Sequence, residues 1–182
     1  MFGIPGLDPF GFVHALLGLS ALVLGLSVVL GRKGTGRHRR LGRLYLLAMV
    51  LLNATGLMIY DLYGSFGPFH WATLVSVATL GAGFVPVFLR RPRLNWTSLH
   101  ATFMCWSYVG LVAAFLSEIA VRVPGIGFGP SVMAATGVTV MGGGILIHSR
   151  VPRIVAAFAK PGRHNIPLQP TSGTARSVDR GE

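Results

Sequence analysis

The sequence predicts an all-α integral membrane protein with five transmembrane helices, the first four forming a bundle. Of its 182 residues, 52% are apolar and only 12% are charged, against about a quarter charged in soluble domains. The mean hydropathy is +0.62, and long apolar runs recur five times along the chain. This composition excludes a disordered chain, a secreted disulfide scaffold and an ordinary soluble enzyme.

Each apolar run has the length that a helix needs to cross the hydrocarbon core, which is about 20 residues. The five runs are 10–30, 44–63, 71–89, 101–121 and 131–147. They nearly fill residues 1–149, which we expect to form one membrane domain. Residues 150–182 are basic and polar, and we expect them to form a flexible cytoplasmic tail.

The basic residues orient these spans. Every Lys and Arg except Arg122 lies in the first connection, the third connection or the C-terminal segment, on one predicted side of the membrane. The positive-inside rule places that side in the cytoplasm and the N-terminus outside, as expected in a bacterial inner membrane. The net charge of +11 therefore indicates topology and contact with anionic lipid. The connections are too short to present a surface to nucleic acid.

Small and polar residues recur at helical spacing in the first four spans. Membrane helices associate through such residues, so each stripe predicts an inward face. The stripe of the second span requires its helix to begin in the basic connection. The four stripes are His14, Gly18, Ala21 and Gly25; His38, Gly42, Tyr45, Met49, Asn53, Gly56 and Tyr60; His70, Thr73, Leu74, Val77, Gly81 and Phe84; and His100, Met104, Ser107, Leu111, Ala114 and Glu118.

The histidines of these stripes alternate between the two membrane surfaces. His14 and His70 are predicted near the outer surface, and His38 and His100 near the inner one. At 1.5 Å per helical residue, only these two pairs are within reach of each other. Two opposed imidazoles are the axial ligands of a six-coordinate haem. The pattern therefore predicts one or two haem b groups, with all four histidines as ligands of haem iron.

Other readings of the histidines remain open. Each of the four also fits an anchor at the membrane interface, and His38 fits a solvated base in a basic connection. His148 lies at the depth of His38 and His100 and is an alternative ligand there. A chlorophyll-type pigment held by single histidines is compatible with the same pattern.

A second group of polar residues lies within or near the predicted spans: Asn53, Asp61, Glu118 and Arg122. Asn53 falls in mid-membrane, where an amide needs a partner or a ligand. Glu118 and Arg122 are one helical turn apart and are expected to pair. The functional alternative is a substrate or proton site beside His14 and His70.

These residues resemble a known family. The segment 33–45, of the pattern Lys-Gly-Thr-x-x-His-Arg-x-x-Gly-Arg followed by Leu-Tyr, is similar to the bacterial membrane family called domain of unknown function 2306. Phe69-His70, His100 with Met104, Ser107-Tyr108, and Glu118 with Arg122 extend the resemblance over residues 10–124. The resemblance implies the helical architecture and the four histidines, and it implies no reaction.

The arrangement of the histidines is also similar to that of the two-haem transmembrane cytochromes b. In that family four helices supply one axial histidine each, paired first with third and second with fourth. The likeness concerns arrangement only, because the loop motifs that bind ascorbate there are not evident here, and fold analogy does not establish function.

Three functions follow from the sequence. The first is a haem-dependent electron carrier, a transmembrane oxidoreductase that takes electrons from or gives them to quinone. The second is a structural or assembly subunit of a larger membrane complex, without a cofactor. The third is a small transporter with Asn53, Asp61 and Glu118 along its path, although five spans show no inverted repeat.

Overall fold

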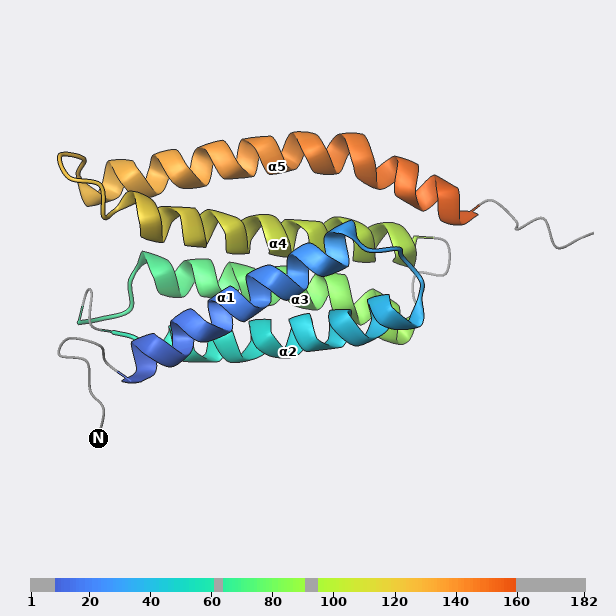
Figure 1. Cartoon of the computed structure of the whole chain (residues 1–182), viewed down its shortest axis with the longest axis horizontal. Helices are drawn as coiled ribbons and strands as arrows, with labels where there is room; N and C mark the ends of the chain where they lie inside the picture. The colour runs from blue at the N-terminus through green and yellow to red at the C-terminus, as the bar shows by residue number, and fades with distance from the viewer. Residues whose placement is uncertain (1–8, 61–63, 91–94, 160–182) are drawn as a thin grey trace, which may run out of the picture.

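The structure, a computed structural model, describes residues 9–60, 64–90 and 95–159. Within these ranges the chain forms five helices and no strand (Figure 1): α1 (Pro9–Leu30), α2 (Gly36–Met58), α3 (Pro68–Leu89), α4 (Trp96–Ala120) and α5 (Phe128–Ala159). All five are long and apolar enough to cross a membrane, so the predicted all-α membrane fold is confirmed. Asp61 and residues 160–182 lie outside the described ranges.

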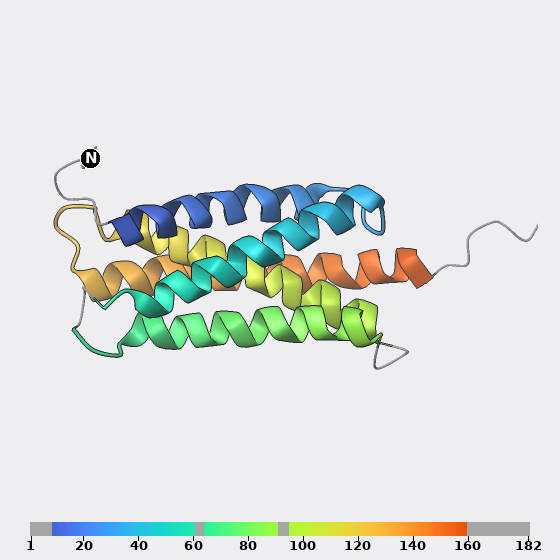
Figure 2. The same ribbon diagram turned by 90° about the horizontal axis from the view of Figure 1, so that it is seen from below.

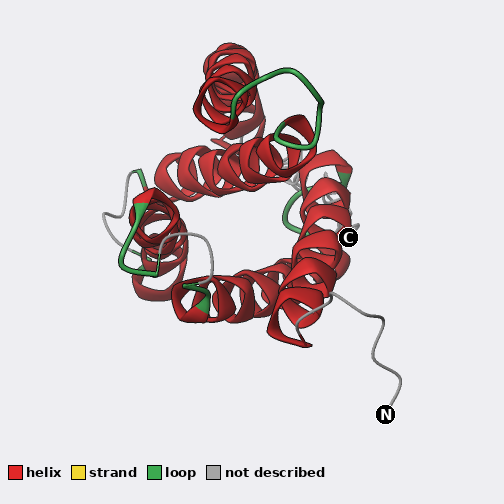
Figure 3. Cartoon of the chain, turned by 90° about the vertical axis from the view of Figure 1, so that its left-hand side faces the viewer, coloured by secondary structure: helices red, strands yellow, loops and turns green. Residues whose placement is uncertain are grey.

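Four helices form a closed ring, and the fifth lies outside it. α1 packs mainly on α2, and α3 packs mainly on α4; contacts of α2 with α3 and of α1 with α4 close the ring. Seen along the helices, α5 stands apart from the ring (Figure 3), where it packs on α4. α2 runs obliquely between α1 and α3 (Figure 2).

α2 begins in the basic connection, well before the apolar run that starts at residue 44. Thr35 is the N-cap, and its hydroxyl accepts a hydrogen bond from the backbone N–H of His38 at 3.1 Å. Such a cap satisfies one of the free N–H groups of a first helical turn. The cap therefore fixes His38 in the first turn of α2, as the stripe of the second span requires.

α5 is longer than the predicted fifth span at both ends. It begins at Phe128 and continues through Pro152 to Ala159, so residues 150–159 of the predicted tail are helical. In Figure 1 its last part extends past the end of the four-helix ring. A helix of this length exceeds a hydrocarbon core of about 30 Å at 1.5 Å per residue.

The buried residues test the predicted inward faces. On α1 the buried residues Ala21 and Gly25 and on α2 Tyr45, Met49 and Asn53 confirm the stripes. On α4, Ser107 and Leu111 are buried as predicted, whereas Ala114 and Glu118 are exposed.

The predicted face of α3 is wrong in part. Leu74, Val77 and Phe84 are exposed, and the buried face instead carries Leu80 and Gly83. Apolar side chains cover both the lipid-facing and the inward side of this helix, so hydrophobicity alone does not distinguish the two.

The orientation in the membrane stays a prediction, and it has a direct test. Reporter fusions after Arg43, Gly67, Arg93 and Gly127 are expected to read cytoplasmic, external, cytoplasmic and external, because basic segments are retained in the cytoplasm. Paired alkaline phosphatase and green fluorescent protein fusions measure both sides. A cytoplasmic signal at Gly67 contradicts the proposed topology.

Candidate functional site

Polar side chains gather at the two ends of the ring, with an apolar layer between them. We call the end with the 31–35 turn the basic end, and the end where α1 begins the N-terminal end. The layer between them is a cluster of buried residues from all four helices: Ala21, Tyr45, Ala48, Met49, Leu52, Leu80 and Leu111. Within it, the Tyr45 hydroxyl and Ser107 Oγ form a hydrogen bond of 3.0 Å. The apolar layer therefore separates the polar residues of the two ends.

At the basic end, α2 and α4 bring two histidines together. The ring centroids of His38 and His100 lie 6.5 Å apart, with the ring planes at 88°. A metal–imidazole bond is about 2 Å long, so two imidazoles bound to opposite sides of one iron place their ring centroids about 6 Å apart. The spacing of this pair therefore matches two axial ligands of one metal.

The hydrogen bonds of this pair agree with that role. His100 Nδ1 lies 2.9 Å from the backbone oxygen of Gly83 on α3; because a carbonyl only accepts, Nδ1 carries the proton and Nε2 keeps a lone pair. A metal-bound histidine commonly donates its other N–H in this way. His38 Nδ1 is buried and has no hydrogen-bond partner. A buried polar atom of this kind calls for a ligand.

The surroundings of the pair add room and positive charge. A Cβ at Gly42, one turn beyond His38, would meet no atom within 4 Å, so a flat macrocycle would not collide with α2 there. Lys33 donates to the backbone oxygens of Val28 and Val29 at 2.6 and 2.5 Å. Burial lowers the pKa of the Lys33 ammonium. Arg37, Arg39 and further arginines follow on the exposed side of α2.

At the N-terminal end, a hydrogen bond ties His14 to α2. Its Nδ1 lies 2.9 Å from Thr55 Oγ1, and that hydroxyl contacts the backbone oxygen of Leu52 at 2.9 Å. Either Thr55 or His14 is the donor in this bond, depending on the tautomer of the ring. A Cβ at Gly56 would lie 3.3 Å from His14 Cε1 and 3.4 Å from Thr73 Oγ1. The His14 ring thus lies between α2 and α3.

His70 is held in the tautomer opposite to that of His100. Its Nδ1 accepts from the backbone N–H of Gly67 at 3.0 Å, so in the neutral ring the proton is on Nε2. That Nε2 is buried without a partner, and the ring stacks between Tyr60 and Phe66 at centroid distances of 4.5 and 4.8 Å. In this geometry His70 presents a donor, whereas an axial ligand presents a lone pair.

The two histidine pairs thus differ in their fit to haem iron. His38 and His100 lie at the spacing of two axial ligands and include an unpartnered buried nitrogen. His70 also has an unpartnered buried nitrogen, Nε2, but that atom carries the proton, which would have to move to Nδ1, against the N–H of Gly67. A haem at the N-terminal end stays a prediction.

The other predicted polar residues that the structure describes lie on α2 and near the end of α4. Asn53 is buried in α2, and its Nδ2 has no partner. Glu118 and Arg122 are exposed at the end of α4, where they form the predicted ion pair at 3.1 Å. Arg122 also donates to the backbone oxygen of Glu118. Asp61 lies outside the described residues.

We expect the Glu118–Arg122 pair to contribute little to stability. Its side chains are 63% and 69% exposed, and exposed pairs at this helical spacing contribute about 0.3–0.5 kcal/mol. A double-mutant cycle with Glu118→Gln and Arg122→Gln, read by thermal unfolding in detergent, should give a coupling of that size. Strict additivity would return Glu118 to the candidates for proton transfer.

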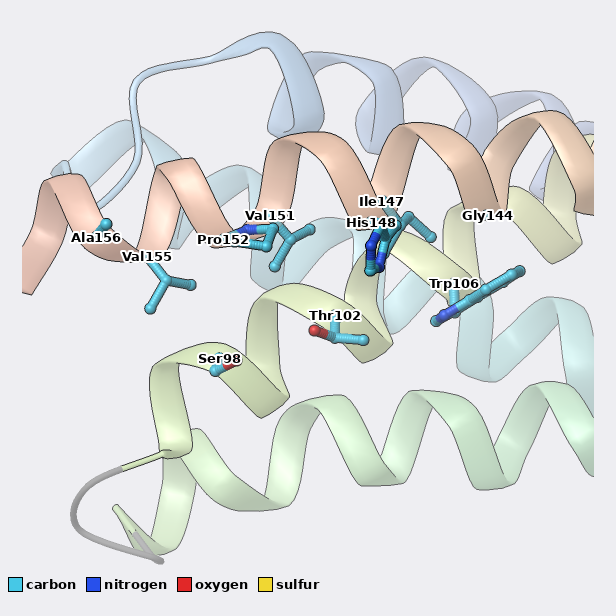
Figure 4. A pocket seen from close by; sticks show the side chains of 10 residues that line it. All are labelled: Ser98, Thr102, Trp106, Gly144, Ile147, His148, Val151, Pro152, Val155 and Ala156. Carbon is cyan, nitrogen blue, oxygen red and sulfur yellow. The ribbon is translucent and has the colours of Figure 1, made fainter.

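His148, the alternative ligand to His38 or His100, does not lie between α2 and α4 with them. It lies on α5 and lines a groove between α5 and α4 on the outside of the ring, with a volume of about 660 Å³ (Figure 4). Facing it are polar residues of α4 at successive turns, Ser98, Thr102 and Trp106. The sequence analysis missed this groove, since α5 carries no polar stripe and each of the α4 residues is unremarkable alone.

Among the residues that the structure describes, no three His, Cys, Asp or Glu side chains gather as they would to hold a bare metal ion.

Comparison with known proteins gives one finding: the model of a family described as predicted membrane protein, DUF2306, matches residues 11–156. No curated protein and no solved structure matches the chain.

Proposed function

The chain belongs to the DUF2306 family of predicted membrane proteins, and we propose that it is an electron carrier with haem b at the basic end of its four-helix ring. His38 of α2 and His100 of α4 would hold its iron. The carrier acts in the inner membrane of a bacterium and exchanges electrons with lipid-soluble quinone.

The observation that carries this proposal is the geometry of the two imidazoles. They lie 6.5 Å apart by ring centroids, the His100 N–H is already donated to Gly83, and His38 Nδ1 has no partner. An iron atom between the two rings would bind the free lone pair of His100 Nε2 and would give the His38 ring a partner.

Each element near the pair has a part in holding haem. Gly83 fixes the orientation of the His100 ring through its backbone oxygen, and such second contacts keep a ligand ring in place. The open space at Gly42 admits the macrocycle edge. Lys33 and the arginines of the first connection supply positive charge for the propionates. Bound haem would supply a one-electron redox couple, whose potential depends on burial and on these charges.

The apolar layer separates the proposed haem site from the N-terminal end of the ring. Tyr45, Met49 and their neighbours close the middle of the ring, so water and ions do not pass from the basic end to the N-terminal end. Electrons can cross such a layer while protons cannot, since a charge in hydrocarbon is costly.

An optical spectrum tests the proposal. Protein purified from a host with ample haem, oxidised and then reduced with dithionite, should show the sharp reduced bands of a low-spin, six-coordinate haem b. Extraction of the pigment as a pyridine complex gives the haem content per chain. A featureless visible spectrum under these conditions contradicts the proposal and favours the cofactor-free subunit of a larger complex.

A further inference from the structure

The groove between α4 and α5 has polar groups without partners on its walls. Ser98, Thr102 and Trp106 follow one another at four-residue spacing on α4, and His148 faces them from α5 (Figure 4). None of these four side chains has a hydrogen-bond partner within the described residues. A polar group without a hydrogen-bond partner raises the free energy of the protein when it lies beside hydrocarbon.

One wall of the groove is the indole of Trp106. A Cβ at Gly144 would lie 3.2 Å from Cη2 of Trp106, so the absence of a side chain there leaves the indole beside a bare stretch of α5. The remaining walls are mostly apolar, from Ile147, Val151 and Val155. At 1.5 Å per residue the polar stretch of α4 from Ser98 to Trp106 is about 12 Å long.

The groove lies one helix away from the proposed haem site. His100 falls between Ser98 and Thr102 in the chain, and it points to α3, where it contacts Gly83. Residues two apart on a helix differ by about 200° in direction. A ligand in the groove and a haem on His100 would therefore lie on opposite sides of α4 at the same depth.

From this placement we propose that the groove between α4 and α5 binds the head group of a lipid-soluble quinone, the electron partner of the haem. This inference rests on the proposed function. A quinone has a flat ring to stack on Trp106 and two carbonyl oxygens at opposite edges to accept from Thr102 and His148. Its tail leaves through the side of the groove that is open to the bilayer.

A phospholipid fits the groove less well. Acyl chains need no donors, and a phosphate needs a cation at the groove mouth. Arg150 and Arg153 are the basic residues of this part of α5, but helical spacing places both on the far side of α5 from the groove. The unpaired donors therefore match the carbonyl oxygens of a quinone.

Electron transfer from a quinol to the proposed haem needs no third reactant. Oxidation of one quinol to the quinone breaks two O–H bonds and releases two electrons and two protons. One quinol would thus supply one electron to the ferric haem of each of two protein molecules, and both protons would leave to water at the basic end.

Fluorescence tests binding independently of haem. In the variant Trp71→Phe, Trp96→Phe, Trp106 is the remaining tryptophan, and decylubiquinone should quench it saturably. His148→Ala with Thr102→Val should weaken this quenching at least about tenfold, as for a site that loses two buried hydrogen bonds. Ser149→Ala is the matched control, since its hydroxyl donates to the backbone oxygen of Leu146, and it should bind as the parent does.

The outcomes separate this inference from the proposed function. Equal quenching in the parent and the double variant overturns the quinone site, whatever the haem content. If anionic phospholipid in nanodiscs changes the Trp106 fluorescence as much as decylubiquinone does, and the double variant loses this change, the groove is a lipid site. That result also overturns the quinone proposal. In haem-containing protein, decylubiquinol should reduce the haem more slowly in the double variant with an unchanged spectrum. An absent haem spectrum with normal quenching instead refutes the proposed electron carrier alone.

Discussion

Replacement of His38 or His100 by alanine is expected to abolish the low-spin haem spectrum. The two imidazoles lie on α2 and α4 at the spacing of two axial ligands, so loss of either leaves a five-coordinate iron with weaker binding and a high-spin spectrum. We expect haem content to fall at least about tenfold, as when metal sites lose their supports. Difference spectra and haem extraction from equal amounts of folded protein measure both effects.

The other histidines serve as controls for this prediction. His148→Ala removes an imidazole of the same depth that lines the outer groove, and it should leave the spectrum unchanged. His14→Ala and His70→Ala should do so too if a single haem is bound. A second spectral component that disappears in both of these variants would establish a haem at the N-terminal end. Unchanged spectra in all of the alanine variants would leave the histidines as interface anchors.

The sequence was sufficient for the fold because a membrane simplifies the problem. Length and hydropathy locate helices that cross hydrocarbon, and all five predicted spans are helices. The ends of the helices were harder to predict where a helix continues beyond the hydrocarbon core. α2 starts at a threonine cap in the basic turn, and α5 runs on to Ala159, both in segments that hydropathy does not recognise.

The inward faces of the helices were harder to predict than their ends. On α2, the alternation of polar and apolar residues marks the buried side, and Tyr45, Met49 and Asn53 are indeed buried. On α3 the residues are apolar all round. The half-buried and buried residues Thr73, Ser76, Leu80 and Gly83 step by three and four, as the predicted stripe does, but from Ser76 on they lie one position earlier.

The sequence brought the four histidines to the correct ends, yet it did not distinguish the two pairs. What separates them is the tautomer of each ring, which depends on contacts between helices. His100 donates to Gly83 of α3, whereas His70 accepts from Gly67 in its own first turn. These contacts favour His38 and His100 as the ligands of the proposed haem.

Gly83 connects helix packing with the proposed haem site, and its replacement by valine is expected to have a large effect. A Cβ there would lie 2.8 Å from Sδ and 3.2 Å from the backbone nitrogen of Met104. The thioether can move, but the backbone of α4 cannot without separating α3 from α4. Because the Gly83 oxygen receives the His100 N–H, this separation removes the contact that orients the ligand.

We therefore expect Gly83→Val to lower haem affinity about 10–100-fold, the usual cost of losing an outer partner of a metal ligand. Overpacking should also cost about 1–3 kcal/mol of stability. Gly81→Val is the control on the same helix, since a Cβ at Gly81 meets no atom within 4 Å, and it should keep wild-type haem content. Haem titration of the purified variants measures the first effect, and thermal unfolding in detergent the second. Wild-type haem affinity in Gly83→Val would show that the contact with Gly83 does not position His100, and a loss in both variants would assign the effect to valine in the helix rather than to the contact with α4.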